Sequence, residues 1–398
     1  MARSAMTMSS GGRIAEHLSV GILARSYPRE RIRKILEELG LQSKRVRDLP
    51  AEVLVYYVIA LGLFMAVSTG EVLRSLVEGL QWLGSRSRLK VAGKAAISQG
   101  RSKLGVAPLK ALWEQSVQML AVRGQPGCFY RGLRLVAIDG STLDVPDTKE
   151  NLAHFGRQRS SRGQAAFPQM RFVGLCECGP HAIFALRMGA YWTPESSLAQ
   201  ELVSELKPGM LCLADRLYSN FGLWQKAASS GAALLWRMRS NAQLPVEKVL
   251  EDGSYLSRIY PSQKAQRQKR NGLVVRVIEY ELEGVEDAEP FYRLITTLLE
   301  PCQAPAEELA ALYAQRWEIE TLLDEFKTHL RGGQVVLRSK TPQLVEQEFY
   351  GMMLAHRAVR TLMNEAAQYQ HLDPDRLSFT HSLRVIRRKL AAMPAISP

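Results

Sequence analysis

The sequence is poor in cysteine, and its few cysteines lack the paired spacing of a metal-binding motif. There are five, an odd number, at Cys128, Cys176, Cys178, Cys212 and Cys302. Cys176 and Cys178 share one face of an expected strand, but no second pair follows at the spacing of a zinc site. The pattern argues against a zinc finger or a disulfide framework, and we expect buried, reduced thiols in a cytoplasmic protein.

Long apolar runs are almost absent as well. Residues 53–70, VLVYYVIALGLFMAVSTG, form the one uncharged run that could just cross a bilayer. Because this run contains tyrosine, serine, threonine and glycine and lies between Glu52 and Glu71, we expect a buried core helix. The N-terminal MARSAMTMSSGGRIAEHL has no apolar signal core, and the chain has no internal repeat or low-complexity tract. No membrane partner is therefore expected.

Acidic residues are the third shortage. The 398 residues include 39 Asp and Glu against 52 Lys and Arg, which gives a net charge of +13. A surface of this sign attracts polyanions through Coulomb forces and counterion release, so nucleic acid is the first partner to consider. Membrane surfaces attract the same charge, and basicity alone does not choose between them. The length allows two or three domains.

The first part of the chain has only helical periodicity. From about residue 10 to 122, apolar residues recur three and four apart, and no strand signal interrupts them. KAAISQGRSKLG, residues 94–105, reads as a short basic helix that could enter a major groove. A solvated basic face on a helical bundle explains it equally well. The Gly- and Pro-containing RGQPGC, residues 123–128, fits a linker, so we expect a helical domain over residues 1–125.

Beyond the linker, strands and helices alternate. Three successive strands are expected between residues 133 and 189, followed by helix, strand, helix and strand as far as residue 239. This order predicts an α/β fold with a mixed sheet flanked by helices. A β-rich stretch follows from about 240 to 300, and a long helix begins after Pro305, whose fixed φ suits a first helical turn.

The long helix carries a one-sided mixture of polar side chains in YAQRWEIETLLDEFK, residues 313–327. At about 100° per residue, four of them fall within an arc of about 60°: Tyr313, Arg316, Glu320 and Lys327. A solvated stripe on a charged amphipathic helix would have the same appearance. The stripe by itself therefore does not identify a site.

Two aspartates follow apolar strands. Asp139 lies at the end of RLVAID and Asp215 at the end of MLCLAD, and a carboxylate at a strand end lies at the rim of a sheet, within reach of a ligand. Each alone is also explained as a turn former, and Asp215 as an ion-pair partner of Arg216. Together with Glu320, they supply the three carboxylates of a two-metal phosphoryl-transfer site, because Mg²⁺ and Mn²⁺ prefer oxygen ligands.

These residues together resemble a known family. The pattern Y-x2-R-x3-E-x6-K, complete in residues 313–327, is similar to the signature of transposases of the insertion sequence 4 family, which have a DDE catalytic triad. It lies downstream of IDGSTLDVPDT and LADRLYSN, which look like the family's first and second aspartate regions. The likeness covers about residues 130–345 and extends more loosely to LPAEVLVYYVIALGLF and ISQGRSKLG in the N-terminal part.

The resemblance implies a role for each matching residue. The acidic residues that would hold two Mg²⁺ or Mn²⁺ ions and carry catalysis are Asp139, Asp215 and Glu320. The residues that would contact phosphates of the transposon end are Tyr313, Arg316 and Lys327. An arginine fork and a lysine point charge both suit phosphate oxygens, so the chemistry agrees with the resemblance.

The resemblance also implies the architecture. A ribonuclease H-like catalytic domain would span residues 126–345, with the β-rich stretch of about 240–300 as the insertion that this family places before the glutamate helix. Residues 1–125 would form a helical DNA-binding domain, and residues 346–398 a helical C-terminal region.

Three further residues are candidates for DNA contact. Trp317 occupies a position where relatives that flip a base have an aromatic side chain, and core packing explains it equally well. Arg237 and Arg239 would line a DNA channel or cover the sheet edge.

The remaining polar residues have simpler interpretations. Asp144 and Asp147 lie near Asp139, but neither directly follows a buried apolar strand. A basic hairpin tip is expected to be a solvated loop that adds nonspecific DNA affinity, at Lys264, Arg267, Lys269 and Arg270. His154 and His356 are expected to be structural.

The resemblance implies a transposase that binds the inverted repeats of its element, hydrolyses the DNA ends and joins the 3′-OH ends to target DNA. Its partner would be double-stranded DNA at both the transposon ends and the target, with a homodimer in the synaptic complex. It would work in the bacterial cytoplasm, with the nucleoid. Two alternatives stay open: a metal-dependent nuclease of the same fold, and an inactive or domesticated copy that only binds DNA.

Overall fold

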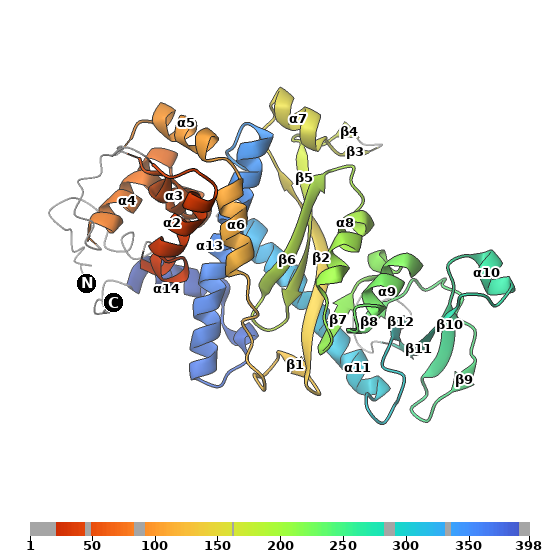
Figure 1. The fold of residues 1–398 in the computed structure, drawn as a ribbon. Coiled ribbons are helices and arrows are strands. Elements are labelled where there is room, and N and C mark those ends of the chain that lie inside the picture. The colour runs from red at the N-terminus through yellow and green to blue at the C-terminus, as the bar shows by residue number, and fades with distance from the viewer. Residues whose placement is uncertain are drawn as a thin grey trace.

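A computed structural model describes residues 21–43, 49–82, 92–160, 163–281, 291–330 and 336–389 of the chain. Helices from the two ends of the sequence gather on one side, and a large sheet with its own helices fills the rest (Figure 1). The segment that was expected to lack a signal core, residues 1–18, lies outside the described residues.

The N-terminal part is helical, as the periodicity predicts. Its helices are α2 (Arg29–Glu38), α3 (Ala51–Leu63), α4 (Thr69–Trp82), α5 (Lys94–Leu104) and α6 (Ala107–Ser116). Every residue of α3 from Val53 to Leu63 is buried, because this helix is apolar on all sides. The expectation of a buried core helix is confirmed for residues 53–63 but was wrong for residues 64–68, which form a turn before α4. No helix among the described residues has the length and apolar character to cross a membrane.

The helix α3 crosses the long C-terminal helix α13 (Pro342–Tyr369) at close range. Two glycines permit the approach: a Cβ on Gly351 would lie 2.5 Å from the carbonyl oxygen of Val58, and one on Gly62 would lie 2.9 Å from the Cα of Met352. The helix α14 (Phe379–Lys389) also packs against α13. The C-terminal helices are therefore part of the same core as the N-terminal helices.

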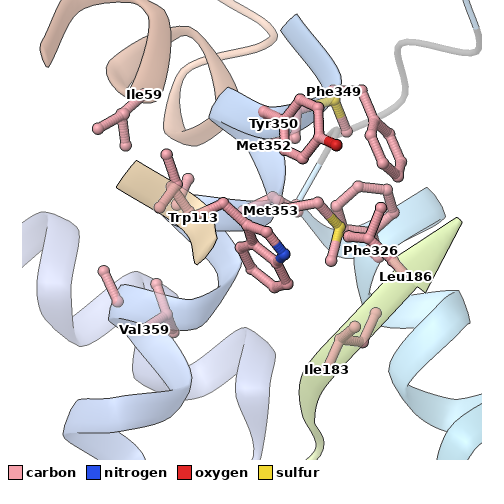
Figure 2. Packing of buried hydrophobic residues seen from close by; sticks show 14 of the residues in the cluster. Ile59, Trp113, Ile183, Leu186, Phe326, Phe349, Tyr350, Met352, Met353 and Val359 are labelled. Carbon is pink, nitrogen blue, oxygen red and sulfur yellow. The ribbon is translucent and has the colours of Figure 1, made fainter. Parts of the chain in front are cut away.

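One hydrophobic cluster joins these helices to the sheet. Figure 2 shows Trp113 of α6 and Met353 of α13 between Ile59 of α3 and Ile183 of strand β6. Phe326 and Phe349 extend the cluster toward the helix that carries the Y-x2-R-x3-E-x6-K pattern, with ring centroids 5.8 Å apart. The position of that helix is thus coupled to the helical part through apolar packing.

A ten-stranded mixed sheet forms the centre of the molecule, in the order β6-β5-β2-β7-β8-β12-β11-β10-β9, with β1 beside β2. Its first strands are β1 (Phe129–Tyr130), β2 (Leu133–Asp144), β5 (Gln169–Glu177), β6 (Ala182–Ala190), β7 (Met210–Ala214) and β8 (Ala233–Arg237). The others are β9 (Lys248–Val249), β10 (Tyr255–Ile259), β11 (Leu273–Tyr280) and β12 (Tyr292–Thr296). A separate short hairpin joins β3 (Arg159–Ser160) to β4 (Gly163–Gln164).

The directions of the strands confirm the predicted mixed sheet. β2, β7 and β8 run parallel to one another, and on the other side of β2 the strand β5 is antiparallel to β2 and β6 is antiparallel to β5. The β-rich stretch continues the same sheet, because β12 pairs with β8. This stretch holds the basic tip as a short helix, α10 (Gln263–Arg267), and the turn after it, between β10 and β11.

Helices cover both faces of the sheet. On one face lie α8 (Glu195–Leu202) and α9 (Phe221–Ala228), packed on even-numbered residues of β2 such as Val136 and Ile138. The opposite face, which includes Leu135 and Ala137, belongs to the cluster with α13 and α12 (Trp317–Asp324). The short α7 (Lys149–Phe155) follows β2. Because side chains alternate along a strand, Asp139 and Ser141 of β2 are on the α12 face.

The cysteines follow the sequence expectation with one exception. All five are free of disulfides, and Cys128, Cys176, Cys178 and Cys212 are buried. Cys302, however, is exposed, so the expectation of burial was wrong for this residue. It lies in the turn between β12 and α11 (Ala306–Tyr313), whereas two of the buried cysteines, Cys176 and Cys212, lie in strands.

Candidate active site

Asp139 and Asp215 lie level with each other on neighbouring parallel strands. Ile138 of β2 pairs with Ala214 of β7, and each aspartate is the next residue of its own chain segment. β7 ends there, but β2 continues to Asp144 because its pairing with β5 continues. The expectation that Asp139 ends its strand was therefore wrong: residues 139–143 of β2 have no described strand on the β7 side, and we call this stretch the open edge.

The helix that carries the predicted pattern is continuous but irregular. It runs from α11 through a 3₁₀ turn at Ala314–Arg316 into α12, and then through a π-helical segment at Glu325–His329. Changes of helical pitch rotate the side chains relative to a regular helix. The four residues expected on one face consequently differ in exposure: Tyr313 and Arg316 are buried, Glu320 is intermediate and Lys327 is exposed.

Tyr313 and Arg316 point into the protein. The Tyr313 hydroxyl donates to the carbonyl oxygen of Ala214 at 3.2 Å, directly before Asp215. The guanidinium of Arg316 donates to Glu320 Oε1 at 2.6 Å, and it lies 5.0 Å from the ring centre of Trp317. Tyr313 thus ties the helix to the end of β7, whereas Arg316 contacts residues of its own helix.

Lys327 reaches the open edge from the other end of the helix. Its Nζ donates to Ser141 Oγ at 2.9 Å, and Ser141 is on the same face of β2 as Asp139. The π-helical segment carries Lys327, and such segments are frequent at functional sites. The helix therefore brings Glu320 and an exposed cation to the face of β2 that holds Asp139.

Burial and neighbouring acids both disfavour the ionised form of Asp139 at the open edge. Burial raises the pKa of Asp139 to about 6, although the Gly140 amide and the Arg316 guanidinium oppose the shift. The negative charges of Glu320 and Glu195 raise this pKa further through Coulomb repulsion. A cation at this position would relieve the repulsion among the acids.

The side chains at the open edge fit a divalent cation in donor type and in charge. The donors are carboxylate oxygens, which hard ions such as Mg²⁺ prefer, and the partly buried Asp139 has a raised pKa despite the nearby Arg316 guanidinium. As the side chains stand, no three His, Cys, Asp or Glu residues in the described ranges lie close enough to hold one ion. Glu320 is instead turned to Arg316, whose guanidinium supplies the local positive charge.

Two residues at this site were not found from the sequence. Glu195 begins α8, and Tyr218 lies in a 3₁₀ turn three residues after Asp215. Both lie beside the predicted acids, because the carboxylates of Asp139, Asp215 and Glu195 all act on the Tyr218 phenol. A charged residue directly after Pro194, at the start of the helix that follows the third strand, was the available signal for Glu195.

The three further candidates for DNA contact are all at the surface or partly so. Trp317 is 60% exposed, so it does not belong to the core. Arg237 lies over the ring of Tyr292 at 4.4 Å, at the end of β8. Arg239 is exposed and lines, together with Leu217, a hollow of about 450 Å³ beside the Asp215 loop.

The two other acids near Asp139 have hydrogen-bond or ion-pair partners close by, and the basic tip is exposed to solvent. Asp144 is the last residue of β2 and accepts a hydrogen bond from Gln169; residues 139–142 before it are only partly buried, so it does not directly follow a buried apolar stretch, as expected. Asp147 is half exposed and pairs with Arg157. The basic tip lies on and after α10, and its four members are all exposed, as expected: Lys264, Arg267, Lys269 and Arg270.

The expected recognition helix, α5, uses one of its basic residues inside the protein. Arg101 is buried and donates to Gln347 Oε1 at 2.8 Å and to Ser339 Oγ at 2.9 Å. Lys94 and Lys103 remain exposed. Only the outer face of α5 is therefore available to a partner.

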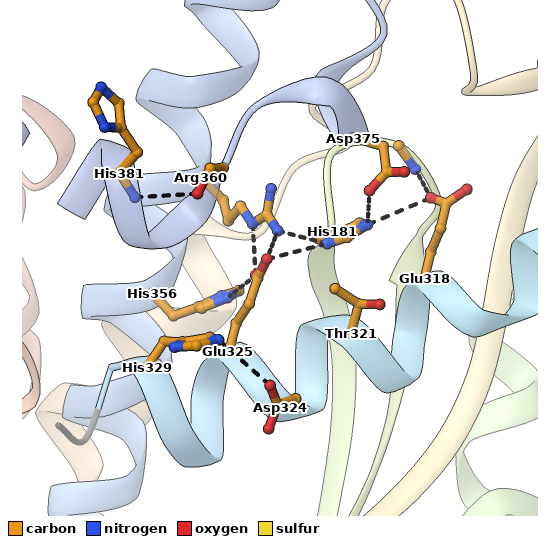
Figure 3. Close-up of polar contacts among 12 residues, drawn as sticks. His181, Glu318, Thr321, Asp324, Glu325, His329, His356, Arg360, Asp375 and His381 are labelled. Carbon is orange, nitrogen blue, oxygen red and sulfur yellow. Dashed lines mark hydrogen bonds and ion pairs between the residues drawn. The ribbon is translucent and has the colours of Figure 1, made fainter. Parts of the chain in front are cut away.

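A buried polar network contacts the helix that carries the Y-x2-R-x3-E-x6-K pattern (Figure 3). Arg360 of α13 donates through Nε to Glu325 Oε2 at 3.0 Å, and His356 Nε2 lies 3.5 Å from the same carboxylate. Burial opposes the ionisation of Glu325, but His181, His356 and Arg360 outweigh it and hold the pKa of this acid well below its usual range. The network ties the π-helical segment to the C-terminal helices.

The network extends along the helix to Glu318. His181 Nε2 lies 3.6 Å from Glu318 Oε2 and 3.1 Å from Asp375 Oδ1 (Figure 3). Burial raises the pKa of Glu318 to about 7, and His181 opposes that shift. His356 is buried in this network, which gives it the structural position expected, whereas His154 is at the surface, 3.8 Å from Glu346.

Two protein-family models match the chain. The model described as insertion element 4 transposase N-terminal matches residues 17–114, and the transposase DDE domain matches residues 130–357. The second match includes Asp139, Asp215 and Glu320.

Curated relatives agree with these models. The transposase InsG for insertion sequence element IS4 of Escherichia coli (strain K12) is 32% identical over 374 residues, which is 93% of this chain and 82% of that protein. The putative transposase InsZ of the same organism is 24% identical over 55% of this chain and 71% of its own length.

A solved structure has a similar arrangement at low sequence identity. It is a cryo-EM structure of a piggyBac transposase synaptic complex with hairpin DNA, with a TM-score of 0.49 and 14% identity. The comparison covers 94% of this chain and 80% of that chain.

Proposed function

The chain belongs to the insertion element 4 family of DDE transposases, and from this premise we propose the steps of its reaction. It binds the terminal inverted repeats of an insertion sequence and hydrolyses one DNA strand at each end. The resulting 3′-OH then attacks a second phosphodiester bond, and the ends are joined to target DNA. Both steps are in-line phosphoryl transfers, which depend on positioning and charge stabilisation and need no covalent protein intermediate.

The catalytic part is proposed to be ribonuclease H-like, with boundaries at about residues 126 and 345. Support comes from the first five strands of its sheet, in which β2, β7 and β8 are parallel and β5 and β6 are antiparallel. The helix that carries Glu320 packs on β2. The β-rich insertion of about residues 240–300 extends the sheet through β12.

The proposal rests on the position of Asp215 and on the electrostatic influence of Glu320, both relative to Asp139 at the open edge. Asp139 and Asp215 are level on adjacent strands, and the Arg316 guanidinium acts on Asp139 while it pairs with Glu320. We assign Asp139, Asp215 and Glu320 as the ligands of two Mg²⁺ or Mn²⁺ ions. When bound, such ions supply charge neutralisation and Lewis-acid activation for hydrolysis.

The remaining residues of the pattern are assigned to the DNA backbone of the transposon end. Lys327 is exposed beside the open edge, so its ammonium can exchange Ser141 for a phosphate oxygen. Arg316 reaches a phosphate only if its pair with Glu320 opens, and the opening frees Glu320 for a metal ion. Tyr313 supports the end of β7 from within, and a phosphate contact would require its hydroxyl to leave Ala214.

Trp317, Arg237 and Arg239 are proposed to contact DNA at the rim of the site. Trp317 is exposed next to Arg316, in a position to stack on a base displaced from the end. The net charge of +13 supplies nonspecific attraction for the same surface.

The helical segment of residues 1–125 is proposed to bind the inverted repeat, with the outer face of α5 as its major-groove contact. Residues 346–398 are proposed to support both parts, since α13 packs against α3 and β6. Because two transposon ends must be brought together, we propose a homodimer in the synaptic complex, in the cytoplasm with the chromosome.

Two alternatives make different predictions for the same DNA. A nuclease of the same fold would cleave the ends but would not join them to a second DNA. An inactive or domesticated copy would bind the ends, with the salt dependence of phosphate contacts, and would cleave nothing.

The test uses the full chain, DNA carrying the ends of its own element, and Mg²⁺. Cleavage and strand transfer are measured for the wild type and for Asp139→Ala, Asp215→Ala and Glu320→Ala. Asp147→Ala is the matched control, because Asp147 is also acidic and near β2 but half exposed and paired with Arg157. Each of the three variants is expected to lose both activities and keep end binding, whereas the control keeps all three.

The outcomes separate the alternatives. Cleavage without joining by the wild type would favour the nuclease, and binding without either activity would favour the inactive copy. Equal cleavage by the wild type and all three variants would mean that the site is elsewhere.

A further inference from the structure

Glu195 begins α8 on the face of the sheet opposite to α12, yet it reaches the same open edge. Its carboxylate is one of the groups that raise the pKa of Asp139. This is possible because β7 ends at Ala214, so beyond Ile138 the strand β2 has no described neighbour on its β7 side. Acids from both faces of the sheet can therefore approach this uncovered edge of β2, which begins at Asp139.

The residue after Asp139 has no side chain, and the space it leaves is occupied by Glu195. A Cβ built on Gly140 would lie 2.9 Å from both Cδ and Oε2 of Glu195. Gly140 has an ordinary strand conformation, without a positive φ, so backbone freedom is not the reason for glycine here. Glycine at position 140 is explained by the close approach of the Glu195 carboxylate to the backbone beside Asp139.

Tyr218 provides a second and independent observation at the same place. Its side chain is fully buried, and its hydroxyl has no hydrogen-bond partner among the described residues. Burial raises the pKa of this phenol, and Asp139, Glu195 and Asp215 act on it in the same direction. An unpartnered buried hydroxyl is costly, so its presence amid three acids indicates that a further group completes the site.

The described residues offer Glu195 one cationic partner, and the contact is loose. Arg171 Nε lies 3.8 Å from Glu195 Oε1, while its NH1 donates to the carbonyl oxygen of Thr193 at 3.0 Å. The side chain of Glu195 is 27% exposed, so an ion from solvent can reach it. The alternative is a purely structural role, in which Glu195 pairs with Arg171 and its negative charge stabilises the N-terminus of α8.

We propose that Glu195 is a fourth carboxylate of the metal site, a ligand of the divalent ion held by Asp139, directly or through a bound water. This inference rests on the proposed function, because it needs the metal site at the open edge. The Tyr218 hydroxyl would donate a hydrogen bond to one of the carboxylates or to a water molecule bound to that ion. The family pattern in residues 313–327 and the two aspartate regions do not include Glu195.

The test measures the affinity of the DNA-free full chain for Mn²⁺. Calorimetry and the electron paramagnetic resonance of bound Mn²⁺ report the binding. Glu195→Gln keeps the shape of the side chain and removes its charge, and Asp139→Asn does the same for the central acid. Glu201→Gln is the matched control, since Glu201 is on α8 as well but is 64% exposed and lies 3.4 Å from Arg187. Thermal unfolding without metal reports whether each variant is folded.

Glu195→Gln is expected to weaken Mn²⁺ binding by about ten- to a hundredfold, as for other groups that support a metal site. Glu201→Gln is expected to bind as the wild type does. If Asp139→Asn loses Mn²⁺ and Glu195→Gln does not, the role of Glu195 is overturned and the proposed function stands. If neither change affects Mn²⁺ binding, the metal site itself is wrong and both proposals fail.

A second measurement locates the ion without using activity. When hydrogen peroxide and ascorbate are added, Fe²⁺ bound at the site reduces the peroxide to a hydroxyl radical and hydroxide, and the radical cuts the nearby backbone; cuts are expected in β2 near Asp139 and at the start of α8. Cuts in β2 alone would overturn the proposal. Arg171→Gln separates the structural role: if it weakens Mn²⁺ binding as much as Glu195→Gln does, the ion pair and not the metal contact explains Glu195.

Discussion

The guanidinium of Arg316 lies 2.6 Å from Glu320 Oε1, so the arginine and the glutamate of the family pattern bind each other in the metal-free protein. Arg316 is buried, and it also acts on Asp139 across the open edge. The positive charge that divalent ions would supply is thus supplied in their absence by a residue of the same helix. A DNA phosphate would compete with Glu320 for Arg316, and a metal ion would compete with Arg316 for Glu320.

Removing the charge of Arg316 tests this relationship. Arg316→Met is expected to lower the free energy of unfolding of the metal-free protein by about 1.5–3 kcal/mol, because Glu320 loses a charged hydrogen bond and faces Asp139 unscreened. Mg²⁺ should restore more stability to the variant than to the wild type. Urea unfolding with and without Mg²⁺ measures both effects. Arg74→Met, at an exposed pair with Glu71, is the control, and equal behaviour of the two variants would contradict the prediction.

Asp139→Asn is expected to stabilise the metal-free protein. Burial raises the pKa of Asp139 to about 6 from the ordinary aspartate value of 3.8, so the ionised acid destabilises the folded state at neutral pH. At pH 7.5 the variant should gain up to about 3 kcal/mol in free energy of unfolding, since each pKa unit corresponds to about 1.4 kcal/mol. Asp147→Asn should show no such gain.

The sign of the pH dependence follows from the same shift. The folded state holds the proton of Asp139 more tightly than the unfolded chain, so this contribution to stability is complete below pH 3.8 and is lost as pH rises through about 6. The advantage of Asp139→Asn over the wild type should therefore shrink from pH 7.5 to pH 5. An advantage that grows on acidification would contradict the assigned shift.

Glu325→Gln is expected to destabilise the protein by about 3–5 kcal/mol, because it leaves Arg360, which is 1% exposed, without its counter-ion. The pKa of Glu325 is held below its usual range, so this stabilisation is present above pH 4.5 and persists into acid until the pH approaches the lowered value. Asp324→Asn, on the adjacent exposed position, is the control and should change stability by less than about 1 kcal/mol. Calorimetric unfolding of both variants decides the matter.

Gly351→Ala tests the crossing of α3 and α13. The new methyl group would meet the carbonyl oxygen of Val58 at 2.5 Å, so the helices must separate and about 1–3 kcal/mol of stability should be lost. Gly70→Ala in α4 meets nothing within 4 Å and should be neutral or stabilising by up to about 1 kcal/mol. Equal unfolding midpoints for the two variants would mean that the crossing can relax.

Trp317→Ala should reduce cleavage of end DNA by about ten- to a hundredfold if its ring stacks on a base, because such stacking contributes about 1–3 kcal/mol. Stability should hardly change, since the side chain is 60% exposed. Trp317→Phe should retain most of the activity, and Tyr369→Ala, which removes an 83% exposed aromatic of α13, should have no effect. Full activity in Trp317→Ala would contradict stacking. Loss of activity in Trp317→Phe would contradict it as well, because a phenyl ring can also stack.

Much of the fold could be predicted because its signals are local. Apolar alternation and turn residues predict β2, β5 and β6, and the uncharged run predicts a helix buried on every side, α3. The spacing of the pattern in residues 313–327 requires only that the segment be helical. Even there, the 3₁₀ turn and the π-helical segment change which side chains are buried, since both depend on the packing of that helix against its neighbours.

The sequence by itself determined the helix that carries Glu320, the two strands that bring Asp139 and Asp215, and the family to which they belong. Only the tertiary structure decided that Arg316 and Tyr313 point inward, that β2 outruns β7 to leave an open edge, and that Glu195 lies beside Gly140. The physical reason is that periodicity and spacing report contacts between residues close along the chain. A carboxylate 56 residues from Asp139, the difference between positions 195 and 139, is brought there by the pairing of three strands and the seating of a helix on them.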